Sequence, residues 1–122
     1  MIANFETLKG LTLKNIERIG DEQLNFETND GRQFRMYHSQ SCCESVYIED
    51  IVGDLNDLIG NPILDASEET NSDQPKTDSE YQDESFTWTF YKISTIKGGV
   101  TIRWYGSSNG YYSESVDFEE AS

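Results

Sequence analysis

The feature that most constrains the fold is an alternation of apolar and polar side chains on both sides of a short turn signal. In "EQLNFET" and "RQFRMYH", which the tripeptide "NDG" separates, apolar side chains occupy every second position. Such alternation is typical of strands with one buried face, and Asn, Asp and Gly tolerate the positive φ that tight hairpins require. We therefore predict an antiparallel hairpin of strands 22–28 and 32–38.

The C-terminal third of the chain shows the strongest strand pattern. "ESFTWTFYKIST", "VTIRWYG" and "YYSESVDF" alternate in the same way and are separated by the glycine-containing turns "KGG" and "GSSNG". Phe86, Trp88 and Phe90 belong to the first of these segments. Because the three segments hold most of the aromatic residues, we predict a three-stranded meander that forms the core sheet.

Two short segments favour helix. Residues 4–9 have Asn4 as a possible cap and Gly10 as a stop, and "DIVGDLNDLIG" (50–60) places apolar side chains at helical spacing before Gly60. "SVYIED" between the hairpin and this second segment is typical of a short strand. The fold class predicted is α+β, a predominantly antiparallel β-sheet of six or seven strands with one or two short helices.

A chain of 122 residues fits one domain, so we expect residues 1–122 to form a single domain. The sequence has no basic start followed by an apolar run, and no segment approaches the roughly 18 apolar residues of a membrane span. These features favour a cytoplasmic protein that does not bind membranes. Residues 67–84 contain almost nothing to bury, and we predict that they form an acidic mobile loop within the domain.

The negative charge is concentrated in one part of the sequence. The net charge is -14, and residues 39–84 contain thirteen acidic residues against Lys76 alone. A field of this sign repels nucleic acids and anionic membranes and attracts basic proteins. The charge therefore argues against direct nucleic-acid binding and favours a basic protein partner. A plain domain that the acidic loop merely keeps in solution is the simpler alternative.

The stretch "YHSQSCCESV" contains the only histidine, His38, and the only two cysteines, Cys42 and Cys43. Imidazole and thiolate are the ligands that zinc prefers, so one hypothesis is a Zn²⁺ site in this loop. The fourth ligand would be a carboxylate, a water or a group from a partner, and Glu44 is the nearest carboxylate. Two inert packing thiols and a disulfide between the neighbouring cysteines are the alternatives.

Known catalytic signatures are not present in the sequence. A zinc deaminase would have a glutamate two residues after the histidine, where this chain has Gln40, and an H-E-x-x-H helix needs a second histidine. "GSSNG" (106–110) fits G-x-S-x-G with Ser108, but a strand rather than a helix is predicted after it. We therefore favour a structural zinc site, a hairpin turn at 107–110, and a protein that is not an enzyme.

Aromatic and acidic residues near the C-terminus are candidates for an interaction surface, because tyrosines are frequent in interface hot spots. Simple packing of the tyrosines on the sheet is the alternative. The candidates are Tyr111, Tyr112, Glu114, Asp117, Glu119 and Glu120.

Three blocks of the sequence resemble a family of small proteins common in phages and prophages. They are "YHSQSCCESVYIEDIVGDLNDLIGNPIL", "ESFTWTFYK" and "VTIRWYGSSNGYYSESVDF". Within that group the chain is similar to zinc-containing anti-CRISPR proteins that act on type II-A effectors of the Cas9 type. Of a metal motif, only His38, Cys42 and Cys43 have counterparts in this sequence, so the resemblance does not settle whether Glu44 is the fourth ligand.

The resemblance implies a phage-encoded inhibitor in the cytoplasm of the bacterial host. Such a protein would bind a type II-A Cas9 effector, plausibly on its recognition lobe, and hinder loading of target DNA, while Zn²⁺ stabilises the fold. The alternative function is a small phage zinc enzyme of the hydrolase type, with an open fourth coordination position and Glu44 or Glu49 as the base.

Overall fold

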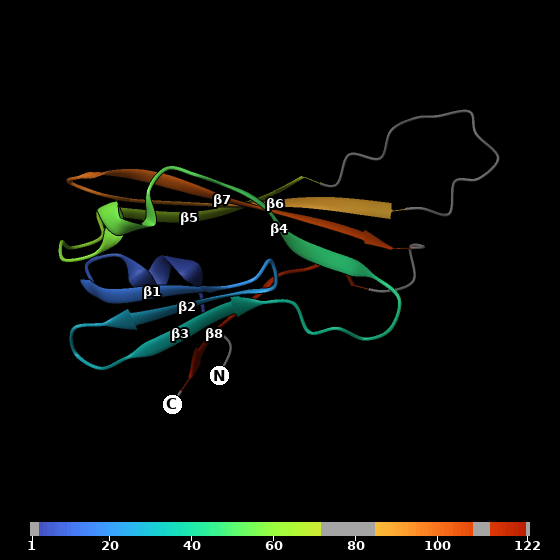
Figure 1. The fold of residues 1–122 in the computed structure, drawn as a ribbon, viewed down its shortest axis with the longest axis horizontal. Helices are drawn as coiled ribbons and strands as arrows, with labels where there is room; N and C mark the ends of the chain where they lie inside the picture. Colours follow the sequence, from blue (N-terminus) through green and yellow to red (C-terminus); the bar gives the residue numbers. More distant parts are fainter. Residues whose placement is uncertain (1–2, 72–84, 109–112, 122) are drawn as a thin grey trace.

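The computed structural model describes residues 3–71, 85–108 and 113–121, which form two facing four-stranded antiparallel sheets (Figure 1). The strand order is β1-β2-β3-β8 in one sheet and β4-β7-β6-β5 in the other. The elements are η1 Phe5–Leu8, β1 Leu13–Ile19, β2 Gln23–Thr28, β3 Gln33–Tyr37, β4 Ser45–Val52, η2 Leu55–Leu58, β5 Asp65–Asn71, β6 Ser85–Thr95, β7 Gly98–Ser108 and β8 Asp117–Ala121. The predicted antiparallel fold with one or two short helices is confirmed, but it has eight strands in two sheets.

The hairpin predicted around "NDG" is confirmed as β2 and β3. Leu24 pairs with Met36 and Phe26 with Phe34, and all four side chains are buried. Because side chains alternate between the two faces of a strand, their neighbours face outward. This hairpin forms the centre of the first sheet, between β1 and β8.

The predicted C-terminal meander is only partly correct. β6 and β7 form its first hairpin, but β8 crosses to the other sheet and pairs with β3. The physical reason is Phe118, which is buried and stacks on Phe34 with ring centroids 5.5 Å apart. Pairing with β3 therefore buries this ring between the two sheets.

The helix predicted for residues 50–60 is wrong for its first half. β4 continues to Val52, and its Ile51 pairs with Ile102 of β7. Gly53 then turns the chain with φ of 110°, where an added Cβ would lie 2.7 Å from the carbonyl oxygen of Gly99. Only the single 3-10 turn η2 follows, and it buries Leu58. The spacing that suggested a helix thus arises from a strand followed by a turn.

The predicted turn at the N-terminus is confirmed as η1. The side chain of Asn4 accepts a hydrogen bond from the Glu6 backbone N–H, as the capping prediction requires. None of the helices in the described ranges is long and apolar enough to cross a membrane.

The acidic segment 67–84 begins as a strand rather than a loop. Residues 67–71 belong to β5, which pairs with β6 along its whole length. Most of its side chains are exposed, so backbone hydrogen bonds to β6, and not side-chain burial, hold this edge strand in place. The remainder of the predicted mobile loop, 72–84, lies outside the described residues.

The core lies between the two sheets and contains side chains from both. Trp104 of β7 is fully buried, and its indole N–H donates to the sulfur of Met36 in β3 at 3.1 Å. Phe5 of η1 packs edge-on against Tyr91 and Phe118, with centroid distances of 4.8 and 5.2 Å. Aromatic side chains therefore link the two sheets and the N-terminal turn into one core.

Candidate functional site

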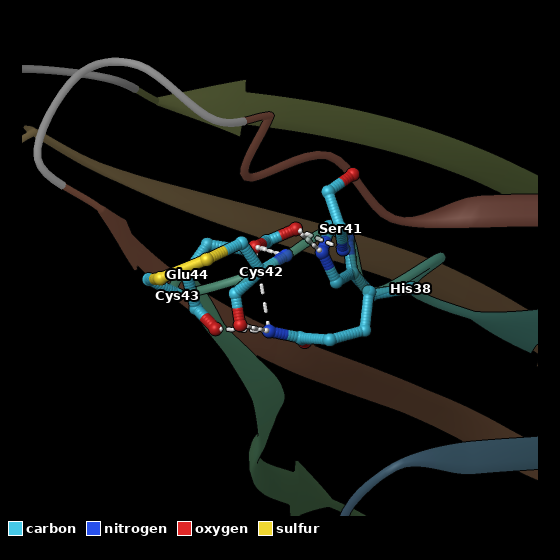
Figure 2. Close-up of a disulfide and its surroundings, with 6 residues drawn as sticks. His38, Ser41, Cys42, Cys43 and Glu44 are labelled. Carbon is cyan, nitrogen blue, oxygen red and sulfur yellow. Dashed lines mark hydrogen bonds and ion pairs between the residues drawn. A yellow bond between two sulfur atoms is a disulfide. The ribbon is translucent and has the colours of Figure 1, made fainter.

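The structure brings all four predicted metal-site residues together in the loop between β3 and β4 (Figure 2). His38 follows β3, and its Nε2 lies 2.8 Å from a carboxylate oxygen of Glu44. The two cysteines are joined to each other, with Sγ of Cys42 bonded to Sγ of Cys43 at 2.05 Å. The loop therefore contains a disulfide between neighbouring cysteines, which was one of the alternatives considered for this sequence.

Glu44 holds the loop together through its buried carboxylate. The backbone N–H groups of Ser41 and Cys42 each donate to it at 2.9 Å, and the Glu44 side chain has no exposed area. The hydrogen bonds from Cys42, Ser41 and His38 lower the pKa of the Glu44 carboxyl to about 2, although burial opposes this shift. The carboxylate is therefore ionised and acts as an internal cap for the loop.

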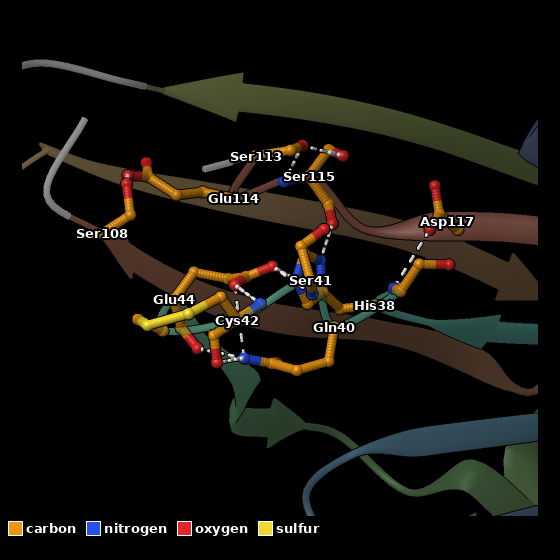
Figure 3. Close-up of polar contacts among 12 residues, drawn as sticks. His38, Gln40, Ser41, Cys42, Glu44, Ser108, Ser113, Glu114, Ser115 and Asp117 are labelled. Atoms are coloured by element: carbon orange, nitrogen blue, oxygen red, sulfur yellow. Dashed lines mark hydrogen bonds and ion pairs between the residues drawn. A yellow bond between two sulfur atoms is a disulfide. The ribbon is translucent and has the colours of Figure 1, made fainter. Parts of the chain in front are cut away.

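His38 connects this loop to the irregular segment that precedes β8. Its Nδ1 lies 2.6 Å from the carbonyl oxygen of Ser115, and its Nε2 faces Glu44 (Figure 3). A carbonyl and an ionised carboxylate are both hydrogen-bond acceptors, so each contact suits a ring nitrogen that carries a hydrogen. The His38 ring therefore links the Glu44 carboxylate to the segment that precedes β8.

This arrangement does not fit a zinc site as it stands. Zinc binds thiolates and a histidine nitrogen with a free lone pair, whereas here the sulfurs are bonded to each other and each His38 ring nitrogen faces an oxygen within hydrogen-bond distance. Across the described residues, no three His, Cys, Asp or Glu side chains converge on one point. The Zn²⁺ hypothesis stays a prediction, and it concerns the dithiol form of Cys42 and Cys43.

The two carboxylates suggested as a catalytic base have other partners. Glu44 accepts the hydrogen bonds described above, and Glu49 is paired with Arg103 of β7. Neither is placed as an unpartnered base beside a reactive group. No observation in this loop favours the hydrolase alternative.

Acid should weaken the fold through Glu44. Its pKa is lowered from an ordinary 4.5 to about 2, so its contribution to stability is present above pH 4.5 and is lost as the pH falls toward 2. Glu44→Gln should therefore be less stable than the wild type at pH 7, and the difference should shrink toward pH 2. Urea unfolding followed by circular dichroism across this range measures the effect.

The control for this prediction is Glu22→Gln, which changes an exposed glutamate in the turn between β1 and β2. This variant should keep the pH dependence of the wild type. A constant difference between Glu44→Gln and the wild type from pH 7 to pH 2 would contradict the role assigned to the Glu44 carboxylate.

Reduction of the disulfide should have a small effect on stability. A ring closed by two adjacent cysteines hardly restricts the unfolded chain, so we expect a change below about 1 kcal/mol in the free energy of unfolding. Thiol titration should find no free thiol before reduction and two after it. Native mass spectrometry of the reduced protein with Zn²⁺ then tests the zinc prediction, and a lack of bound zinc with unchanged melting would contradict it.

Ser108 of the G-x-S-x-G segment lies in a strand and is hydrogen-bonded to a neighbouring side chain. It is buried in β7, and its hydroxyl donates to the Glu114 carboxylate at 2.6 Å (Figure 3). Thr87 and Ser85 of β6 donate to the other oxygen of Glu114 at 2.8 and 3.3 Å. The hydroxyl of Ser108 thus contributes to stabilising a buried carboxylate, and the rest of the predicted turn, 109–110, lies outside the described residues.

The other predicted interaction residues near the C-terminus are spread over different environments. Tyr111 and Tyr112 lie outside the described residues, and Glu114 is buried as described above. Glu119 accepts from Arg35 and Tyr37, while Glu120 accepts both arms of the Arg32 guanidinium at 3.0 Å. The backbone N–H of Ser39 donates to Asp117 at 3.2 Å. These acids stabilise the first sheet and the start of the His38 loop.

The most extensive candidate for a binding surface is the outer face of the second sheet, which we call the aromatic face. It comprises Tyr47 of β4, Tyr105 of β7, and Phe86, Trp88 and Phe90 of β6. Tyr47, Tyr105 and Trp88 are direct neighbours across three strands, so they form one row. Trp88 and Tyr105 have ring centroids 4.7 Å apart, and Tyr47 follows at 5.8 Å.

A second row of charged side chains lies beside the aromatic row. Arg103 pairs with Phe90, which in turn pairs with Glu69 of β5. The Arg103 guanidinium lies 5.6 Å from the centre of the Trp88 ring and forms ion pairs with Glu49 and Asp50. The aromatic face is therefore bordered by carboxylates on both sides, at β4 and at β5.

This face corrects the predicted core. Phe86, Trp88 and Phe90 point outward and are half-buried, whereas Tyr91 and Ile93 of the same strand are buried. Alternation predicts which side chains of a strand share a face, but it does not say which face is buried. In β6 both faces contain apolar side chains, so either could have faced the core. The neighbouring strand could have resolved this choice. In β7 only Val100, Ile102 and Trp104 form an apolar row, so they must face the core, and the register with β7 then determines which side chains of β6 face the core.

The outer face of the first sheet is different in character. A shallow depression on it is lined mainly by amides and charged groups, including Gln23, Asn25, Gln33 and Arg35. Asn25 accepts from Gln23 at 2.7 Å and donates to Glu17 at 3.5 Å, so these polar groups satisfy one another. Only the second sheet thus presents a concentrated aromatic surface in the described part of the chain.

Together these observations define a small protein of two antiparallel sheets, with a capped disulfide loop at one end and an aromatic face bordered by carboxylates. Residues 6–118 match the family described as a domain of unknown function (DUF7448), so the chain belongs to this family. Comparison with curated proteins gave no match, and comparison with solved structures gave none.

Proposed function

We propose that this protein is a non-enzymatic binding protein that docks its aromatic face onto a basic surface of a partner protein. The observation that supports this best is the row formed by Tyr47, Tyr105 and Trp88 on an outer sheet face. Tryptophan, tyrosine and arginine are the side chains that most often dominate the energy of protein interfaces. The face contains all three types.

The charge around the face supports a basic partner. Glu49 and Asp50 border it at β4, where both pair with Arg103, and Glu69 borders it at β5, where it pairs with Lys92. The border therefore has three carboxylates and two cationic side chains. The whole chain has a net charge of -14, which accelerates the approach of a positively charged protein. Electrostatic complementarity chiefly raises the association rate, whereas the aromatic rings would supply most of the binding energy.

For the partner we propose a type II-A effector of the Cas9 type. The support is the resemblance of the sequence to phage anti-CRISPR proteins together with the acidic charge. Cas9-type proteins hold their nucleic acids in positively charged channels, so an acidic protein docked there would hinder loading of target DNA. On this proposal the protein is encoded by a phage and acts in the cytoplasm of the bacterial host.

Binding to a purified type II-A Cas9 with its guide RNA tests this proposal. We expect a complex that resists gel filtration and a loss of target-DNA binding when the inhibitor is added first. Raising the salt concentration from 50 to about 500 mM should slow association, because screening shortens the range of the charge interaction. No complex with several type II-A effectors would contradict the Cas9 part of the proposal. Inhibition that does not depend on salt would contradict the electrostatic part.

A further inference from the structure

A groove runs along the side of the molecule where the two sheets separate, between β5 and residues 113–118. It consists of two hollows of about 320 and 400 Å³ that share Glu68 and Val116 as lining residues. One hollow extends along β6 to Thr87 and Thr89, and the other extends toward Phe5. The two hollows adjoin at these shared residues, and we call them together the groove. Because Thr89 and Tyr91 of β6 are buried on the inner side of the second sheet, the groove lies on the opposite side of that sheet from the aromatic face.

The backbone of β5 forms one wall of this groove. β5 is the edge strand of its sheet and pairs with β6 alone within the described ranges. In an antiparallel strand, alternate residues direct their N–H and C=O groups away from the neighbouring strand. Such an edge is a template for the addition of another extended chain. Glu68 and Thr70 of this edge line the groove.

The side chains that line the groove are acidic and hydroxylated. Glu68 and Thr70 lie opposite Tyr91 and Thr89 of β6, so they share the inner side of the sheet. Two further acidic residues, Glu114 and Asp117, line one hollow each, and Figure 3 shows them along the segment from Ser113 to Asp117. Among the described residues that line the two hollows there is no lysine or arginine. The groove therefore suits a ligand with positive charges along an extended backbone.

A buried tyrosine lies next to the residues that line the groove. Tyr91 has no exposed area, and its hydroxyl lies beside the Glu68 carboxylate. It leaves β6 on the same side as Thr89, directly opposite Glu68, and both of these residues line the groove. Burial, and then the neighbouring carboxylates of Glu68 and Asp117, raise the pKa of the Tyr91 phenol, so it stays protonated. The Tyr91 hydroxyl is therefore a neutral neighbour of Glu68, the acidic residue that both hollows share.

We propose that this groove binds an extended basic segment of a partner protein, which adds as a further strand to the edge of β5. The backbone of the segment pairs with β5 around Glu68 and Thr70. Alternate lysine or arginine side chains reach the carboxylates of Glu68 and Asp117. This site is separate from the aromatic face and does not depend on the identity of the partner proposed above.

The test uses a capped peptide of alternating lysine and valine, about seven residues long as in a typical strand. Titrated into the ¹⁵N-labelled full chain, it should shift the amide signals of Glu68, Thr70 and Thr89 in a saturable manner. A peptide of the same charge with N-methylated alternate amides should bind at least about tenfold more weakly, because main-chain hydrogen bonds supply the affinity of strand addition. Equal binding of the two peptides would overturn strand addition, and shifts located elsewhere would overturn the groove as the site.

A charge variant sharpens this test. Glu68→Gln should weaken peptide binding about two- to fivefold, as expected for the loss of one exposed ion pair. Glu22→Gln removes the same charge from the turn between β1 and β2 and should leave binding unchanged. Both residues are exposed, so both variants should fold, which the amide spectrum itself will show. Equal weakening by the two variants would indicate attraction by net charge alone and would contradict the proposed site.

Discussion

Trp104→Ala is expected to lower the free energy of unfolding by about 3–5 kcal/mol, the range for removing a large buried aromatic side chain. Trp104 is fully buried, and its indole N–H donates to the sulfur of Met36 in the facing sheet. The substitution would leave a cavity between the sheets and remove this link. Because domains of this kind are stable by about 5–15 kcal/mol, the variant should lose a large share of its stability.

The chain contains a matched control for this prediction. Trp88→Ala makes the same chemical change on the outer face, where the indole is only half-buried, and should cost about 1 kcal/mol. Urea unfolding followed by far-ultraviolet circular dichroism is suitable, since fluorescence would depend on the tryptophans that are being removed. Equal losses for the two variants would contradict the distinction between the core and the aromatic face.

Local sequence patterns predicted the hairpins of this fold but not the way in which the sheets are assembled. β2 with β3 and β6 with β7 are joined by short turns, so alternation and turn residues were sufficient to place them. β8 pairs with β3, which lies about eighty positions earlier in the sequence. No local signal specifies such a distant partner, because the choice depends on which sheet edge remains open and on where Phe118 is buried.

The candidate site also depends on contacts between residues far apart in the sequence, which local patterns do not predict. The cluster around His38 was visible in the sequence because its residue types are rare in this chain, and the structure places His38 and Glu44 in direct contact. Its chemistry was harder to predict. The hydrogen bond from His38 to the Ser115 carbonyl depends on a segment 77 residues away. Without that distant acceptor the histidine appears available as a ligand, whereas the fold gives both its nitrogens oxygen partners.

Trp88→Ala is expected to weaken binding to the Cas9-type effector by about thirtyfold or more, which corresponds to the roughly 2 kcal/mol that defines an interface hot spot. Trp88 contacts Tyr105 and Phe90 and lies beneath the Arg103 guanidinium, so it occupies the middle of the aromatic face. The substitution should mainly raise the dissociation rate. It removes contacts within the bound complex and leaves the charges that control the association rate unchanged. Biolayer interferometry with the immobilised effector measures both rates.

Tyr37→Ala is the matched control, since Tyr37 is an aromatic residue of the first sheet that packs against Arg35. Its affinity should stay within about twofold of the wild type. Glu69→Gln, at the border of the aromatic face, should instead slow association and reduce its dependence on salt, because exposed charges act mainly on the encounter. If Trp88→Ala and Tyr37→Ala bind equally well, the aromatic face is not the docking surface. If Trp88→Ala weakens binding while Glu69→Gln leaves the association rate and its salt dependence unchanged, the rings mediate binding without electrostatic assistance from that border.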